Sequence, residues 1–140
     1  MLELLLSTIA ALGSTEAQNV LTSAGERVVK KNQDSHAWKK LIVGTGEFFV
    51  KNEQEENSFF EDLALVLSKE NLTQIAEDLK AEDGYDLEHK LYKSLMKLMN
   101  KYEIPYEVAE AYTIKIIYAV LEQLRTIDPD KYEHYFLQEW

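Results

Sequence analysis

Apolar side chains recur every three or four residues along most of this chain, with polar and charged side chains between them. This spacing puts the apolar positions on one face of an α-helix. The pattern is clearest after Asp86, where the apolar face holds Leu87, Leu91, Leu95, Leu98, Met99 and Tyr102. Glu88 and lysines occupy the other face. We therefore predict a core-facing helix that Asp86 caps.

Glycines and prolines divide the rest of the pattern into further helices. Gly13, the segment Gly44-Thr45-Gly46 and two prolines interrupt it. Pro105 and Pro129 each suit the first turn of the helix that follows. The predicted helices cover residues 2–12, 15–31, 35–43, 58–67, 71–83, 87–102, 105–127 and 129–140.

Capping residues mark where several of these helices begin. Asp34 is placed to cap the third helix. Ser58 with Glu61 fits a capping box, in which each side chain accepts a hydrogen bond from a backbone N–H of the first turn. Asn71 with Gln74 gives a second signal of this kind. The polar stretch at residues 51–57 is predicted to be a loop.

Together these elements predict an all-α fold, a compact bundle of seven or eight helices without strands. The chain has 140 residues, of which 46% are hydrophobic, and this length suits one hydrophobic core. We therefore predict a single helical domain over residues 1–140. Residues 1–46 form its N-terminal helices and residues 47–140 a second helical region.

The amino-acid composition bears on the cellular compartment in which this chain is expected. Cysteine is absent, which excludes disulfides, zinc–thiolate sites and thiol nucleophiles and is compatible with a reducing cytosol. Residues 1–12 are apolar but lack a basic start and a cleavage site, so we predict no signal peptide. An apolar stretch of about 20 residues, long enough to span a bilayer, is missing. We expect a cytoplasmic protein without a membrane partner.

The formal net charge of −10 is concentrated in the middle of the chain. Residues 1–46 carry four acidic against five basic side chains, residues 47–90 carry thirteen against four, and residues 91–140 carry eight against six. The negative electrostatic potential of this acidic segment opposes binding to a phosphate backbone, so we expect no nucleic-acid ligand. The acidic segment is either a solvated face or a surface that recognises a basic partner.

The sequence gives no sign of catalytic, cofactor or metal chemistry. Asp86 with His89, and Asp130 with His134, share helix faces, but two ligands are too few for a closed metal site. His36 follows the Asp34 cap without a third ligand nearby. We therefore predict no catalytic residue, no cofactor, no metal and no small-molecule substrate. The chain is expected not to be an enzyme.

Two specific activities, RNA cleavage and nucleotide binding, match the residues poorly. A helical ribonuclease of the HEPN kind has an arginine followed within about four to six positions by histidine, whereas eight residues separate Arg27 from His36 and Arg125 from His134. The segment Gly44-Thr45-Gly46 lacks the lysine and hydroxyl residue of a phosphate-binding loop. The ribonuclease stays an alternative, and the glycines are better explained by a helix break.

Aromatic side chains give the candidate partner-binding residues. Four of them crowd the last nine residues, where a helix end frays unless something covers it. This segment either folds back on the bundle, continues into a further part of a longer protein, or meets a partner. Interaction surfaces favour aromatic anchors. The predicted partner-binding residues are Phe59, Phe60, Tyr132, Tyr135, Phe136 and Trp140.

Several segments resemble a known family. They are Gly84-Tyr85-Asp86-Leu87, Leu98-Met99-Asn100-Lys101-Tyr102-Glu103-Ile104-Pro105, Ala109-Glu110-Ala111-Tyr112, Asp128-Pro129-Asp130-Lys131-Tyr132 and Phe136-Leu137-Gln138-Glu139-Trp140. Over residues 47–140 this pattern is similar to the N-terminal helical region of bacterial STAND-type (NACHT/NLR-like) defence NTPases. The resemblance implies a non-catalytic adaptor that oligomerises or passes a signal between larger domains. The 140 residues contain neither the ATPase core nor the effector domain of such proteins.

The leading hypothesis is therefore a non-enzymatic helical protein–protein interaction or adaptor domain of a bacterial antiphage defence protein. Its partner is a protein or a second copy of the chain. One alternative is an acidic inhibitor that mimics nucleic acid to bind a basic partner, and another is a helical ribonuclease. Salt dependence separates the first alternative from an apolar interface, because attraction between exposed charges weakens as ionic strength rises.

Overall fold

The part of the chain that the structure describes forms six helices. The computed structural model describes residues 14–44, 46–50, 52–81 and 87–127. Within these ranges there is no strand, so the predicted all-α class is confirmed. The helices are α2 (Ser14–Lys31), α3 (Ser35–Ile42), α4 (Glu53–Val66), α5 (Lys69–Ala81), α6 (Leu87–Lys101) and α7 (Tyr106–Ile127). The helices predicted at residues 2–12 and 129–140, which would raise the number to eight, lie outside the described residues.

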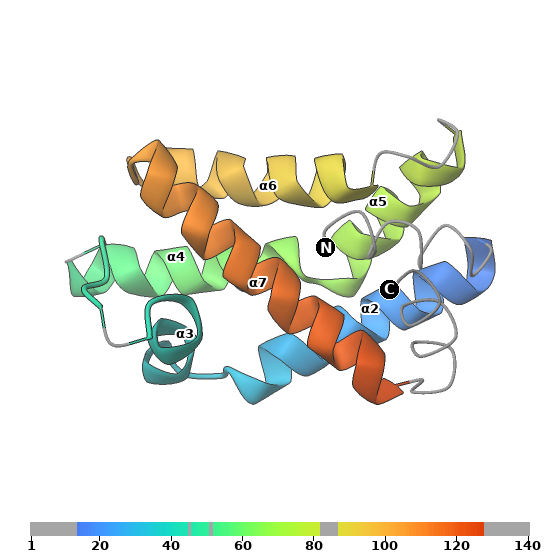
Figure 1. Ribbon diagram of the computed structural model, residues 1–140, viewed down its shortest axis with the longest axis horizontal. Coiled ribbons are helices and arrows are strands. Elements are labelled where there is room, and N and C mark those ends of the chain that lie inside the picture. Colours follow the sequence, from blue (N-terminus) through green and yellow to red (C-terminus); the bar gives the residue numbers. More distant parts are fainter. Residues whose placement is uncertain (1–13, 45, 51, 82–86, 128–140) are drawn as a thin grey trace, which may run out of the picture.

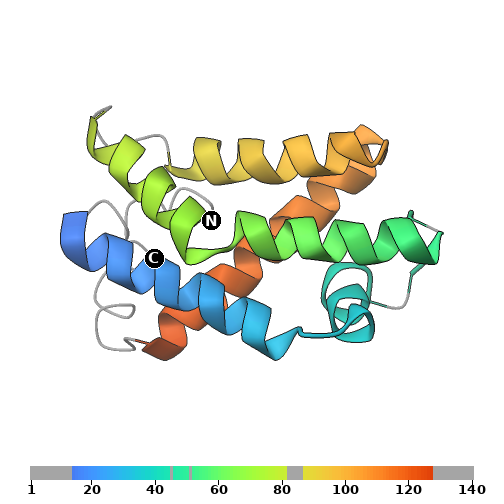
Figure 2. The same ribbon diagram turned by 180° about the vertical axis from the view of Figure 1, so that it is seen from behind.

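Helix α7 crosses the other helices on one side of the molecule (Figure 1). It packs against α2, α3 and α6. Seen from behind, α4, α5 and α2 lie in front of α7 (Figure 2). Helices α4 and α6 contact each other and run antiparallel, side by side in both views. Because these two helices are neighbours, their solvent-facing sides adjoin.

The core lies between these helices, and the predicted stripe of α6 faces it. Leu91, Leu95, Leu98 and Met99 are buried, as the spacing predicts. Helix α7 adds its own inner row, which includes Ala109, Tyr112, Ile116, Ile117 and Val120. Burial of these side chains removes apolar surface from water, which is the main favourable contribution to folding.

Helix α3 begins and ends where the sequence predicts. Asp34 is its N-cap, and the carboxylate accepts a hydrogen bond of 2.8 Å from the backbone N–H of Ala37. The helix ends at Ile42, and Gly44 has a φ of 67°. A left-handed residue just after a helix is a common terminator, and glycine adopts it without steric cost.

The predicted start of α4 was wrong. The helix begins at Glu53, because the Asn52 side chain accepts hydrogen bonds from the backbone N–H groups of Gln54 and Glu55. Acidic residues in the first turn add a favourable interaction with the helix dipole. Ser58 lies inside the helix, where its hydroxyl donates to the carbonyl of Gln54. Most of the stretch that was predicted to be a loop is therefore helical.

Helix α5 also begins earlier than predicted, at Lys69. The Ser68 hydroxyl accepts a hydrogen bond from the backbone N–H of Asn71. The Asn71 side chain instead donates to the carbonyl of Val66, over 2.6 Å. Asn71 thus ties the start of α5 to the end of α4 and does not cap the helix.

Candidate functional site

Phe59 and Phe60, two of the predicted partner-binding residues, belong to the core. Their side chains are 0% and 6% exposed. Phe48 stacks on Phe60 with ring centroids 5.4 Å apart, and Trp38 stacks on the same ring at 6.4 Å. Phe59 meets the edge of Tyr102 at 5.2 Å. These residues hold α3, α4 and α6 together, so the prediction that they face a partner was wrong. Tyr132, Tyr135, Phe136 and Trp140 lie outside the described residues.

The acidic side chains of α4 fall into two groups. Glu53, Glu55 and Glu61 are exposed. Glu56 is buried and forms an ion pair with Lys39 of α3, and Asp62 is bound by α6. Two of these carboxylates therefore join helices, while the other three present negative charge to solvent.

Asp62 connects α4 to the end of α6. Its Oδ2 accepts hydrogen bonds from Lys101 Nζ at 2.8 Å and from the Tyr102 hydroxyl at 2.7 Å. The Lys101 ammonium, and secondly the Tyr102 hydroxyl, hold the pKa of Asp62 below its usual range. Burial and the adjoining Asp62 carboxylate raise the pKa of Tyr102, so its hydroxyl stays protonated.

The surface around this ion pair combines opposite charges with an exposed leucine. Glu61 precedes Asp62, and Leu65 follows it by three residues and is 65% exposed. Lys97 lies one helical turn before Lys101 and is exposed. Residues three or four apart are neighbours on a helix surface, so Leu65 adjoins Asp62 and Lys97 adjoins Lys101, whereas Glu61, directly before Asp62, faces another direction. We call Asp62, Leu65, Lys97 and Lys101 the α4–α6 surface.

The two helices of this surface carry opposite charge. Every charged side chain of α4 is acidic, whereas α6 carries four lysines and one glutamate. Lys93 is exposed one turn before Lys97 and extends the basic side of α6. An acidic helix and a lysine-rich helix therefore lie side by side and run antiparallel (Figure 2).

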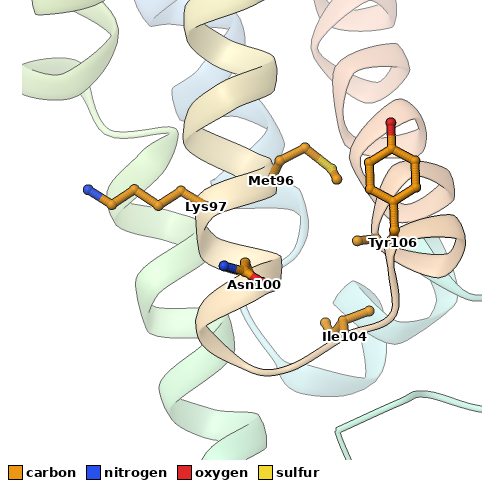
Figure 3. A pocket seen from close by; sticks show the side chains of 6 residues that line it. Met96, Lys97, Asn100, Ile104 and Tyr106 are labelled. Atoms are coloured by element: carbon orange, nitrogen blue, oxygen red, sulfur yellow. The ribbon is translucent and has the colours of Figure 1, made fainter.

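A shallow hollow of about 420 Å³ lies beside this surface, between the end of α6 and the start of α7 (Figure 3). Buried Ile104 and Ala109 form its floor. Asn100 of α6 and Tyr106 of α7 lie on its rim, and the Met96 side chain points across it (Figure 3). The hollow thus has an apolar floor and a mixed rim.

The turn that closes this hollow has an unusual residue. Glu103 has a φ of 56°, although it is not glycine. The N–H of Ile104 donates to the carbonyl of Met99, and the N–H of Glu103 to that of Asn100. These two bonds define a Schellman motif, whose left-handed position normally holds glycine. Ile104 and Met99, whose backbones this bond joins, are both buried, which fixes the turn between α6 and α7.

A carboxylate with two tyrosines borders the hollow on α7. Glu110 Oε2 accepts hydrogen bonds from the hydroxyls of Tyr92 at 3.1 Å and Tyr106 at 3.0 Å. The hydrogen bond with Tyr106, followed by burial and Glu110, raises the pKa of Tyr92. The Tyr92 phenol therefore stays protonated at neutral pH, and the group serves to join α6 to α7.

Neither a metal-binding cluster nor a membrane-spanning helix occurs among the described residues. No group of three or more His, Cys, Asp or Glu side chains there is arranged to hold a metal ion. In the same ranges, no helix combines the length and apolar character needed to cross a bilayer. His36 is exposed in the first turn of α3, and Arg27 is exposed on α2. His134 lies outside the described residues.

The sequence prediction missed the α4–α6 surface and the Asn52 cap. An asparagine followed by acidic residues is itself a helix-start signal, so the cap was recognisable. The surface depends on which helices pair, and periodicity gives no information on that pairing. Glycine normally marks a left-handed position, and position 103 holds glutamate, so the sequence did not indicate this turn.

Comparison with known proteins found no family model, no curated protein and no solved structure that matches this chain. The resemblance to the STAND-type helical region therefore stays a prediction.

Proposed function

We propose that this chain is a non-enzymatic helical protein-interaction domain. The observation that supports this most is the α4–α6 surface, where Leu65 is exposed on an acidic helix that packs against a lysine-rich helix. Protein interfaces typically surround an apolar anchor with a charged or polar rim. A partner that covers Leu65 would bury apolar area and meet both charges.

The resemblance to the STAND-type helical region suggests where such a domain would act. As an adaptor of a bacterial antiphage defence protein, the domain would act in the cytoplasm by oligomerising or by passing a signal between larger domains. Its partner is then a protein or a second copy of the chain. The predicted tail residues Tyr132, Tyr135, Phe136 and Trp140 stay candidates for a second contact.

Site-specific photo-crosslinking tests the proposal. The photoreactive amino acid p-benzoylphenylalanine replaces Leu65 in the full chain, which is expressed in bacteria and irradiated. We expect a cross-linked species that contains either a second copy or one defined protein. The same replacement at exposed Lys115 is the control, because Lys115 lies on α7 near Gly44 and away from the α4–α6 surface. Equal cross-linking at the two positions, or none at position 65, would contradict the proposal.

An acidic inhibitor that mimics nucleic acid is the second candidate function. Exposed Glu53, Glu55 and Glu61 on α4 favour it, since they present three carboxylates to solvent. Such an inhibitor should lose a basic partner steeply between 50 and 500 mM salt, whereas an interface centred on Leu65 should weaken little. If the chain is such an inhibitor, replacing Glu53 and Glu55 with glutamine should abolish its binding to the basic partner. Cross-linking at position 65 should stay intact.

A further inference from the structure

We propose that Met96 is a site of selective and reversible oxidation, at which a hydroperoxide converts the thioether into a sulfoxide. The chain has three methionines and no cysteine, so its only sulfur atoms are thioethers. Met1 lies outside the described residues. Met99 is 0% exposed, whereas Met96 is partly buried and lines the hollow between α6 and α7. An oxidant in solution therefore reaches the sulfur of Met96 before that of Met99.

The hollow gives access to the Met96 sulfur from one side only. The Met96 side chain points across the hollow, with the sulfur near its tip (Figure 3). From the protein side, the hydroxyl of Thr113 donates a hydrogen bond of 3.3 Å to Sδ, and Thr113 is 0% exposed. A thioether sulfur has two lone pairs and accepts weak hydrogen bonds. One lone pair is thus held against the core, and the other faces the hollow.

The oxidant in this reaction is hydrogen peroxide. The open lone pair of Met96 attacks one peroxide oxygen, an S–O bond forms as the O–O bond breaks, and the second oxygen leaves as water after a proton moves to it. Sulfur is oxidised by two electrons and the peroxide is reduced. Because the oxygen adds from the hollow, one sulfoxide epimer forms. Separate reductases act on the two epimers, so one of these enzymes is expected to restore the thioether.

Oxidation also weakens the junction between α6 and α7. Met96 belongs to α6 and Thr113 to α7, so their hydrogen bond joins the two helices. In the sulfoxide, the new oxygen lies on the hollow side and the electron-poor sulfur is a weaker acceptor. The buried Thr113 hydroxyl therefore loses its partner, and an unpaired buried hydroxyl destabilises the folded state.

Peptide mapping by mass spectrometry tests the selectivity. The full chain is treated with hydrogen peroxide and digested with trypsin, which cleaves after Lys93, Lys97 and Lys101 and so places Met96 and Met99 on separate peptides. In the folded chain, Met96 should gain one oxygen about tenfold faster than Met99 or more, because Met99 reacts only when the structure opens. In urea the two rates should become equal. Equal rates in the folded chain would overturn the proposal.

The two reductases test the direction of attack. Peptides from the chain that was oxidised while folded are treated with each enzyme separately. One enzyme should reduce nearly all of the Met96 sulfoxide and the other almost none of it. The Met99 peptide from the chain oxidised in urea is the control, and each enzyme should reduce about half of it. Reduction of half of the Met96 sulfoxide by each enzyme would overturn one-sided access.

Thermal unfolding tests the effect on the helix junction. Oxidation of the folded wild-type chain should lower the midpoint by about 3–6 °C. Met96→Leu keeps an apolar side chain without sulfur, so peroxide should not shift its midpoint. Thr113→Val removes the hydroxyl, so oxidation at Met96 should shift the midpoint of this variant less than that of the wild-type chain. An oxidised wild-type chain with an unchanged midpoint, or equal shifts in wild type and Thr113→Val, would overturn the link between Met96 and Thr113.

Discussion

Glu103 shows how a single residue shapes the surface near the hollow. Its φ of 56° lies in the left-handed region, which costs a residue with a side chain about 1–2 kcal/mol. Two backbone hydrogen bonds and the burial of Ile104 hold it there. The turn between α6 and α7 is therefore maintained by its surroundings rather than by the preference of the residue itself.

Replacing this residue with glycine should stabilise the protein. Glu103→Gly removes the steric cost of the left-handed conformation, and we expect the free energy of unfolding to rise by about 0.5–1 kcal/mol. Glu107→Gly is the matched control, because the same change within the first turn of α7 should lower it by a similar amount. Urea denaturation measures both. A loss of stability in Glu103→Gly would show that the Glu103 side chain is needed in the turn.

Asp62 makes stability depend on pH in the acidic range. Its pKa in the folded state is lower than its usual value of 3.8, so its contribution is present above that value and is lost as the pH falls further. Asp62→Asn should lower the free energy of unfolding by about 1 kcal/mol or less at pH 7. Between pH 4 and pH 3 the variant should lose less stability than the wild-type protein. Urea denaturation of the dilute chain at pH 7, 4 and 3 measures this. Parallel pH profiles for the two proteins would contradict the assigned role.

At the scale of helices, the hydrophobic spacing predicted α6 and α7 well and the start of α4 poorly. Leu91 and Leu95, or Ile116 and Val120, recur regularly because one face of a long helix meets the core. The start of α4 depends on one hydrogen-bonding side chain, and Asn52, Ser58 and Asn71 are all residue types that cap helices. The sequence alone does not show which of these three residues caps α4. The structure does, because it shows which backbone groups each side chain contacts.

Two alanine substitutions test which residue caps α4. Asn52→Ala should lower the free energy of unfolding by about 1 kcal/mol, because two backbone N–H groups of the first turn lose their acceptor. Ser58→Ala should be neutral or slightly stabilising, since Ser58 lies on the exposed face inside the helix and alanine favours helix. Thermal and urea denaturation measure the two effects. The reverse order would restore the capping box that the sequence suggested.

Gly25 lies where α2 packs closely against the turn between α4 and α5. A Cβ atom at this position would lie 2.7 Å from the carbonyl oxygen of Leu67 and would also clash with Leu72. Gly25→Ala should therefore lower the free energy of unfolding by about 2 kcal/mol, although alanine is the better helix former. Glu26→Ala, at the adjoining exposed position, should change it by less than about 0.5 kcal/mol. A stabilised Gly25→Ala protein would contradict the close packing of these helices.

At the scale of the whole molecule, helix pairing turns scattered sequence features into one surface. The excess of acid around α4 and the lysines of α6 are visible in the sequence, but only their packing makes them adjoin. The same packing buries Phe59 and Phe60, which the sequence suggested for a partner, and leaves Leu65 exposed. Non-local contacts decide both outcomes, so periodicity within one helix was not sufficient to predict them.

The central claim is that this chain works through the α4–α6 surface, and photo-crosslinking from position 65 tests it most directly. The account predicts one defined cross-linked species, with a second copy or with another protein, when p-benzoylphenylalanine replaces Leu65, and none when it replaces Lys115. Equal cross-linking at the two positions, or none at position 65, would contradict it.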